Sequence, residues 1–147
     1  MGMLDGRVAI ITGASKGIGR ALALRFGREG ARVICAARSA DLVKETTAEV
    51  NKAGNRAIAF TGDLSREDDV QRLVAAGLQA FGKIDALVNN AGDGGPTKPV
   101  QDYTVEDWRY TIDSCLTSSY LCIRFVVPEM IKAGGGAIVN ISSGAEQ

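Results

Sequence analysis

Histidine is absent from the sequence, and this absence removes the commonest general base at neutral pH and the commonest metal ligand. Any acid–base chemistry must therefore use hydroxyl, carboxylate or amine groups, and we predict no metal site. An excess of charge of one sign is also lacking, because Lys+Arg and Asp+Glu each number 17. This balance gives no electrostatic reason to expect nucleic acid or an anionic membrane as a partner.

Long hydrophobic runs and an even set of cysteines are missing too. No apolar stretch approaches the ~20 residues of a membrane span, and residues 1–7 contain no hydrophobic signal core. The three cysteines are an odd number, so we expect reduced thiols in a cytoplasmic protein rather than a disulfide framework. The 147 residues suit one domain, 1–147, whose partners we expect to be a small-molecule substrate and other copies of the chain.

A glycine-rich segment near the N-terminus predicts a phosphate-binding turn. Residues 12–19 read Thr-Gly-Ala-Ser-Lys-Gly-Ile-Gly and lie between the apolar run 8–11 and an amphipathic helical pattern. Glycine can adopt positive φ and lets a pyrophosphate approach the backbone, while the free N–H groups of the first helical turn face the anion. The spacing G-x-x-x-G-x-G differs from the general dinucleotide pattern, and no Gly-Lys-Ser/Thr of an NTPase loop follows. Taken alone, the glycines could also form a turn without a ligand.

Short β-branched runs alternate with helical patterns along the chain. We predict strands at 8–12, 32–37, 56–61, 84–89 and 137–142, and helices at 18–29, 41–52, 66–81 and 105–132. Such alternation indicates βαβ crossovers, and strands that are apolar on both faces suit a sheet covered on both sides. The predicted fold class is α/β, a doubly wound parallel sheet with helices on both faces.

Local signals mark where the predicted helices begin and end. Ser65-x-x-Asp68 and Thr104-x-x-Asp107 can cap two helices at their N-termini. Pro128 lies inside the last helical pattern and should kink or end that helix. The glycines expected to follow three helices in a left-handed conformation are Gly30, Gly54 and Gly82.

Three further motifs follow or close predicted strands: Asp63-Leu64, Asn89-Asn90-Ala91-Gly92 and Ile138-Val139-Asn140-Ile141-Ser142-Ser143. Together with the glycine turn, and in this order, they resemble the short-chain dehydrogenase/reductase family over nearly all 147 residues. The turn spacing is similar to that of the shorter reductase branch of the family. The resemblance implies a Rossmann-type fold and an oxidoreductase that transfers hydride between a nicotinamide cofactor and a carbonyl or secondary alcohol.

The resemblance also implies which residues contact the cofactor. The pyrophosphate would meet Gly13, Ser15, Gly17, Ile18 and Gly19, the adenine Asp63 and Leu64, and the nicotinamide-side ribose Asn90, Ala91 and Gly92. For Asp63 a second interpretation is a turn-forming residue after a strand.

The end of the second predicted strand indicates the choice of cofactor. An NAD site generally ends this strand with an acid, whereas here the strand ends in Arg38 with no acid beside it. Arg38 could hold a 2′-phosphate through its planar donor fork, and Lys16 could add a second positive charge. Both positions match the NADP-preferring pattern of the family, so NADP(H) is predicted over NAD(H). The alternative is that both side chains are solvated charges.

The catalytic residues implied by the resemblance are Asn, Ser, Tyr and Lys, and only one of them is matched. Ser143 corresponds to the catalytic serine, Cys115 stands where the asparagine is expected, and no Tyr-x-x-x-Lys follows Ser143 before Gln147. We therefore expect these 147 residues to be inactive alone and to be part of a longer oxidoreductase. The alternative is a non-catalytic nucleotide-binding or interaction module.

The last predicted helix carries a stripe of apolar and small side chains. In the family this helix forms a dimer interface, which implies a homo-oligomer, and packing against the chain's own sheet is the other interpretation. The stripe consists of Ile112, Cys115, Leu116, Ser119, Ile123, Val126 and Met130.

Overall fold

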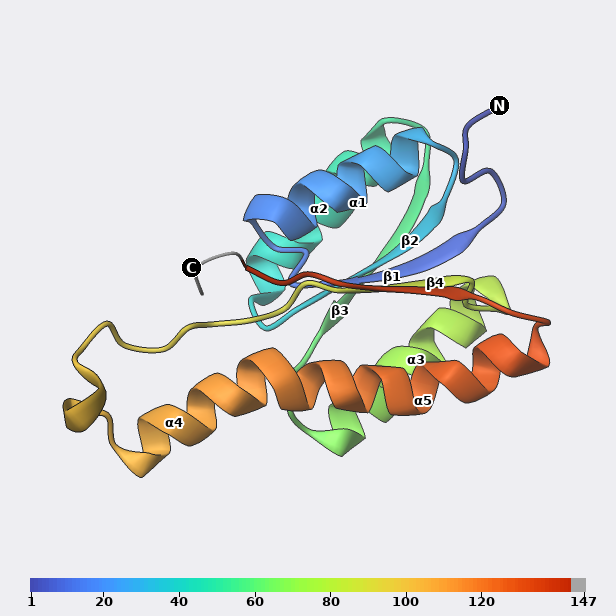
Figure 1. The fold of residues 1–147 in the computed structure, drawn as a ribbon. Helices are drawn as coiled ribbons and strands as arrows, with labels where there is room; N and C mark the ends of the chain where they lie inside the picture. The colour runs from blue at the N-terminus through green and yellow to red at the C-terminus, as the bar shows by residue number, and fades with distance from the viewer. Residues whose placement is uncertain (144–147) are drawn as a thin grey trace.

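The structure, a computed structural model, describes residues 1–143 and contains a five-stranded parallel sheet in the order β3-β2-β1-β4-β5 (Figure 1). The strands are β1 (Val8–Thr12), β2 (Arg32–Ala37), β3 (Arg56–Thr61), β4 (Ala86–Asn89) and β5 (Ala137–Asn140). From the central strand β1 the chain first builds outward through β2 and β3, and then crosses to the other side to add β4 and β5. The direction of winding therefore reverses between β1 and β4. The predicted α/β doubly wound fold is confirmed.

Helices cover both faces of the sheet, with α1 and α2 on one face and α3 and α5 on the other (Figure 1). The helices are α1 (Gly17–Arg28), α2 (Ala40–Lys52), α3 (Glu67–Phe81), α4 (Val105–Ile112) and α5 (Ser118–Lys132), with a short 3₁₀ turn η1 (Val100–Asp102) and a π-helical turn η2 (Asp113–Thr117). No described helix is both long enough and apolar enough to cross a membrane.

Two hydrophobic cores lie on the two faces of the sheet, because successive strand residues point in opposite directions. Ile10 belongs to the core that contains Leu73 of α3 and Val126 of α5. The next residue, Ile11, belongs to the core that contains Val43 of α2 and other residues of α1 and α2. β1 and all but the first residue of β2 are completely buried, so the sheet is covered on both sides at its centre.

The strands at the two edges differ from the prediction of apolar strands buried on both faces. In β3, Ala59 and Thr61 are exposed, and in β5 Val139 is 50% exposed. β4 and β5 are also shorter than predicted, since β4 begins at Ala86 rather than at residue 84 and β5 ends at Asn140 rather than at residue 142. Each edge strand pairs with one neighbour only within the described residues, which leaves backbone groups available for further pairing.

The predicted helix 105–132 divides into α4, the π turn η2 and α5, which follow one another without a break (Figure 1). Pro128 does not end α5, which continues to Lys132. Pro128 is exposed, so water can satisfy the carbonyl that loses its helical partner. Of the predicted stripe, Val126 and Met130 lie in the chain's own core, whereas Leu116 is 62% exposed. The stripe thus packs on the sheet only in its second half.

The helix-end predictions are confirmed in part. Thr104 and Asp107 form a capping box at α4, with Oγ1 of Thr104 accepting from the Asp107 amide at 3.0 Å. The predicted cap at Ser65 is wrong, because α3 begins after Arg66 and Ser65 donates instead to Asp63. The glycines that end three helices have φ values of 89°, 84° and 78° at Gly30, Gly54 and Gly82.

Candidate functional site

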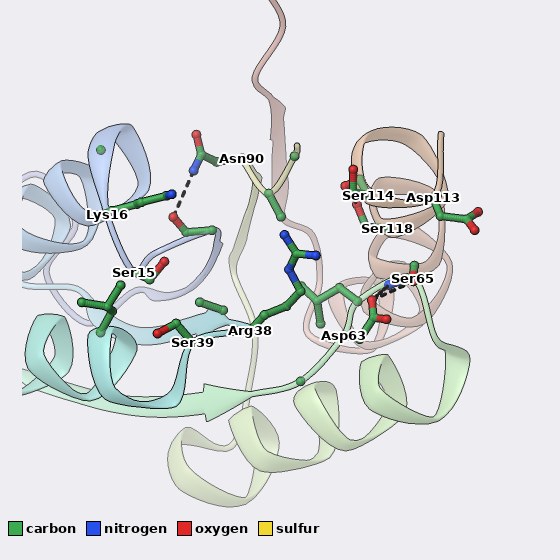
Figure 2. A pocket seen from close by; sticks show the side chains of 18 of the residues that line it. Ser15, Lys16, Arg38, Ser39, Asp63, Ser65, Asn90, Asp113, Ser114 and Ser118 are labelled. Carbon is green, nitrogen blue, oxygen red and sulfur yellow. Dashed lines mark hydrogen bonds between the residues drawn. The ribbon is translucent and has the colours of Figure 1, made fainter. Parts of the chain in front are cut away.

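A cleft of about 620 Å³ opens at the carboxyl ends of the strands, where the winding of the sheet reverses. Its wall is built by the segments that follow β1, β2, β3 and β4, together with one side of α4 and α5 (Figure 2). Eleven of the predicted cofactor residues line it: Gly13, Ser15, Lys16, Gly17, Ile18, Arg38, Asp63, Leu64, Asn90, Ala91 and Gly92. Four segments far apart in sequence therefore meet at one site.

Gly19, the remaining predicted cofactor residue, is buried and does not line the cleft. A Cβ at this position would lie 2.6 Å from Nδ2 of Asn90 and still closer to the carbonyl oxygen of Gly13. Gly13 has φ of +64°, and a Cβ there would lie 3.0 Å from Cα of Ala91. These two glycines let the start of α1, the turn after β1 and the segment after β4 pack directly on one another.

The N-terminus of α1 faces the cleft without a side-chain cap. Lys16 occupies the N-cap position, no hydrogen bond from a side chain of the described chain caps the helix, and its first turn contains no acidic residue. The free N–H groups and the positive end of the helix dipole favour an anion at this point. Lys16 itself is exposed beside the turn and adds a positive charge.

A buried threonine joins the two loops that flank the reversal point. Oγ1 of Thr12 accepts from the amides of Asn90 and Ala91 at 3.0 and 2.9 Å and donates to the Val88 carbonyl at 3.3 Å. Nδ2 of Asn90 in turn donates to the carbonyls of Thr12 and Gly13 at 3.2 and 3.3 Å. Sequence reasoning did not select Thr12. A threonine that ends a buried strand directly before a glycine turn is the signal that could have found it.

Arg38 lies at the end of β2 and extends its guanidinium into the cleft (Figure 2). Its Nη1 donates to the Tyr110 hydroxyl at 3.0 Å, and that hydroxyl donates to Oδ2 of Asp93 at 2.7 Å. Nη2 of Arg38 lies 3.5 Å from the same carboxylate oxygen. The sequence shows no acid beside Arg38, and the structure supplies one from the segment after β4.

The charged forms of both Arg38 and Asp93 are stabilised by this contact. The Tyr110 hydroxyl, the Gly95 amide and the Arg38 guanidinium hold the pKa of Asp93 below its usual range. The hydrogen bond to Tyr110, aided by the Asp93 charge, raises the pKa of Arg38. Tyr110 and Asp93 were both missed as site residues, because they are distant from Arg38 in sequence.

Ser39 follows Arg38 and also lines the cleft, as the N-cap residue of α2. No capping hydrogen bond from its hydroxyl is found in the described chain. The start of α2 thus adds polar groups next to Arg38. Ser39 was missed although a serine immediately before a helical pattern is a recognisable signal.

Asp63 and Leu64 form the part of the wall that follows β3. Oδ1 of Asp63 accepts from both the amide and the hydroxyl of Ser65, at 3.0 and 2.7 Å, so this carboxylate stabilises a turn. Asp63 remains exposed at the cleft, while Leu64 is only 5% exposed and belongs to the hydrophobic core. The turn-forming interpretation of Asp63 is thus confirmed, and the contact with adenine stays a prediction for a carboxylate that lines the cleft.

Ser143 and Cys115 occupy the two predicted catalytic positions, and neither lines the cleft. Ser143 follows β5, is exposed and is not among the residues that line the cleft. Cys115 lies in the π turn, and its thiol donates to the Asp93 carbonyl at 3.4 Å. The described residues contain no cluster of three or more His, Cys, Asp or Glu side chains that could hold a metal ion.

The family model and the curated relatives that match this chain agree on one family. The family model described as short chain dehydrogenase matches residues 7–147. The chain is 39% identical over 143 residues to a 3beta-hydroxysteroid dehydrogenase of Mediterraneibacter gnavus. The matched region covers 97% of this chain and 51% of that protein. It is also 39% identical over 144 residues to the 7alpha-hydroxysteroid dehydrogenase of Escherichia coli K12, covering 98% of this chain and 56% of that protein. The chain thus spans about half the length of the curated relatives it matches.

Solved structures show the same fold. NAD⁺-bound xylitol dehydrogenase has a TM-score of 0.93 and 34% identity, over 97% of this chain and 55% of that one. A metagenomic short-chain oxidoreductase in complex with NADP has a TM-score of 0.91 and 40% identity, over 98% of this chain and 65% of that one.

Proposed function

Because this chain belongs to the short-chain dehydrogenase family, we propose that it binds NADP(H) in the cleft as part of an oxidoreductase. The reaction would be hydride transfer between the nicotinamide and a carbonyl or secondary alcohol. The observation that carries the proposal is the uncapped start of α1, which faces a glycine-lined cleft where the sheet reverses its winding.

The pyrophosphate would lie on the glycine turn. Gly13 and Gly17 have positive φ and present backbone rather than side chains to the cleft, while Ser15, Lys16 and Ile18 complete its wall. The N–H groups of the first turn of α1 would donate to the phosphate oxygens, and Lys16 would lower the cost of bringing the negative charge there. Gly19 would contribute through packing, since its missing Cβ keeps α1 against the turn.

The adenosine half would lie between the ends of β2 and β3. We assign the 2′-phosphate to Arg38 and Ser39, because a guanidinium and an N-terminal helical turn both favour a dianion. Asp63 and Leu64 would contact the adenine. The solved relatives include one bound to NAD⁺ and one bound to NADP, so the preference for NADP(H) is argued from these residues alone.

The nicotinamide half would extend past Asn90, Ala91 and Gly92 toward Ser143. When bound, the nicotinamide supplies or accepts the hydride. Ser143 would then donate its hydroxyl hydrogen bond to the substrate oxygen as negative charge develops there. Hydrogen bonds between Thr12 and Asn90 join the two loops. They would hold this side of the cleft at a fixed position relative to the pyrophosphate turn.

Titration of the chain with NADPH and NADH, followed by calorimetry, tests the cofactor assignment. We expect NADPH to bind more tightly. Arg38→Ala should weaken NADPH selectively, by something like the ~1.5–3 kcal/mol of a charge-assisted hydrogen bond. Lys44→Ala is a matched control, because Lys44 is an exposed cation on α2 that does not line the cleft. Equal affinities for the two dinucleotides would contradict the assignment.

A non-catalytic nucleotide-binding module is the second candidate. Cys115 favours it, because a thiol that donates to the Asp93 carbonyl cannot offer the donor and acceptor pair of an amide. The natural full-length protein should be tested with NADPH and NADP⁺ against a panel of ketones, aldehydes and secondary alcohols. Turnover supports the oxidoreductase, and dinucleotide binding with no turnover supports the module.

We also propose a cytoplasmic homo-oligomer. Large apolar side chains are exposed on α4, η2 and α5, among them Trp108 at 63%, Leu116 at 62% and Tyr120 at 54%. A second copy of the chain packed against this face would bury them. Light scattering coupled to gel filtration measures the mass in solution, and a monomer at every concentration would contradict the proposal.

A further inference from the structure

The guanidinium of Arg38 already has a carboxylate partner within the chain. Oδ2 of Asp93 lies 3.5 Å from Nη2, and the Tyr110 hydroxyl bridges the two groups by accepting from Arg38 and donating to Asp93. The three residues come from the end of β2, the segment after β4, and α4. A 2′-phosphate bound at Arg38 would therefore meet a resident negative charge.

The backbone of Asp93 is held in place from the π turn. Its amide donates to Oγ of Ser114 at 3.2 Å, and its carbonyl accepts from the same hydroxyl at 2.9 Å and from the Cys115 thiol at 3.4 Å. Its other carboxylate oxygen, Oδ1, accepts from the Gly95 amide at 2.9 Å. With both the backbone and Oδ1 fixed, Oδ2 is directed toward Arg38 and Tyr110.

The ion pair is weak enough to be exchanged. The side chains of Arg38 and Asp93 are 56% and 42% exposed, so water and salt screen their attraction. A phosphate dianion carries more charge than a carboxylate and accepts the guanidinium fork with two oxygens. It would therefore bind Arg38 in place of Asp93, at the cost of the ion pair that it breaks.

We propose that Asp93 is a specificity-determining residue that acts as an internal counter-ion for Arg38 and narrows the preference of the cleft for NADP(H) over NAD(H). With NADH bound, Arg38 keeps Asp93 as its partner and no unpaired positive charge faces the ribose. With NADPH bound, the 2′-phosphate must displace Asp93 from Arg38, so the free energy of that ion pair is subtracted from the binding free energy of NADPH. This inference rests on the proposed function, because it assumes that the cleft binds a nicotinamide dinucleotide.

Asp93→Asn tests the proposal, because the amide keeps the shape of the side chain and an oxygen for the Gly95 amide but removes the charge. Calorimetric titration at fixed ionic strength should show NADPH binding about three- to tenfold more tightly than to the unmodified chain. NADH affinity should change by less than about twofold, so the ratio of the two affinities rises. Glu106→Gln is the matched control, because it removes one negative charge from exposed α4 without contacting Arg38.

An Arg38→Ala background separates the counter-ion role from simple repulsion. In that background, the gain in NADPH affinity caused by Asp93→Asn should be less than half of the gain seen when Arg38 is present, because the ion pair no longer exists. An unchanged NADPH to NADH ratio in Asp93→Asn, an equal change in Glu106→Gln, or a full gain without Arg38 would each overturn the inference. Failure of the unmodified chain to bind either dinucleotide would instead refute the proposed function, so the two failures can be told apart.

Discussion

Gly19→Ala should lower both the stability of this chain and its affinity for the nucleotide, because one added methyl group disturbs the packing beneath the proposed pyrophosphate site. The new Cβ would lie 2.6 Å from Nδ2 of Asn90 and nearer still to the Gly13 carbonyl oxygen. Both neighbours are held by hydrogen bonds across the reversal point, and one of them is backbone, so neither can move alone. The start of α1 must shift away from the turn instead.

The expected cost is at the upper end of that seen for an extra methylene in a packed interior, about 3 kcal/mol in the free energy of unfolding. The shift also moves the N–H groups proposed to bind pyrophosphate, so NADPH affinity should fall by at least about tenfold, which is ~1.4 kcal/mol. Urea unfolding followed by circular dichroism gives the first quantity, and calorimetric titration of the folded variant gives the second.

Gly54→Ala is the control. Gly54 has φ of +84° and a Cβ there would meet nothing within 4 Å, so the substitution costs only the left-handed conformation, about 1–2 kcal/mol. It lies after α2, away from the cleft, and NADPH affinity should not change. If Gly19→Ala kept both its stability and its NADPH affinity, the close packing of α1 on the glycine turn would not control the site.

Three further predictions follow from single side chains. Burial raises the pKa of Cys35 to about 11 and that of Cys122 to about 12, so in the native protein a disulfide reagent should modify only the exposed Cys115, and three thiols should react after unfolding. Lys98 and the Thr104 amide hold the pKa of Asp107 below its usual range, so its contribution to stability is present above about pH 3.9 and is lost as the pH falls further. Thermal unfolding between pH 6 and 2.5 should show a shallower acid decline in Asp107→Asn than in the unmodified chain. In the full-length natural protein, Ser143→Ala should lower kcat by ~10²–10³ and leave NADPH affinity unchanged, and near-normal kcat would make Ser143 a structural residue.

The parts of the fold that the sequence predicts correctly are those decided by local residues. β1, β2 and β3 have their predicted bounds because their apolar runs are short and are bounded by turn residues. The glycine turn is predictable for the same reason, since positive φ at Gly13 and Gly17 requires the residue type found there. Ten other predicted cofactor residues line the same cleft as Gly13, because parallel strands end at one edge of the sheet.

The contacts that complete the site join residues that no local pattern connects. The Thr12 hydroxyl bonds to Asn90 and Ala91 across the sheet, and Arg38 meets Asp93 only because β2 and β4 both flank β1. The π turn was missed for a different reason: its residues continue the helical pattern, so propensity and periodicity cannot distinguish one extra residue in the turn from a regular helix.

That extra residue sets the rotational phase between the two parts of the helix. A regular helix advances about 100° per residue, so deletion of one residue from η2 would rotate α4 by about that angle about its axis while α5 stayed packed on the sheet. Tyr110 would then point away from Arg38, and Ser114 and Cys115 could not both reach the Asp93 carbonyl. Among natural relatives, a change of helix length by one residue at this point would therefore alter the surroundings of the guanidinium that corresponds to Arg38 without any substitution in the residues that touch it.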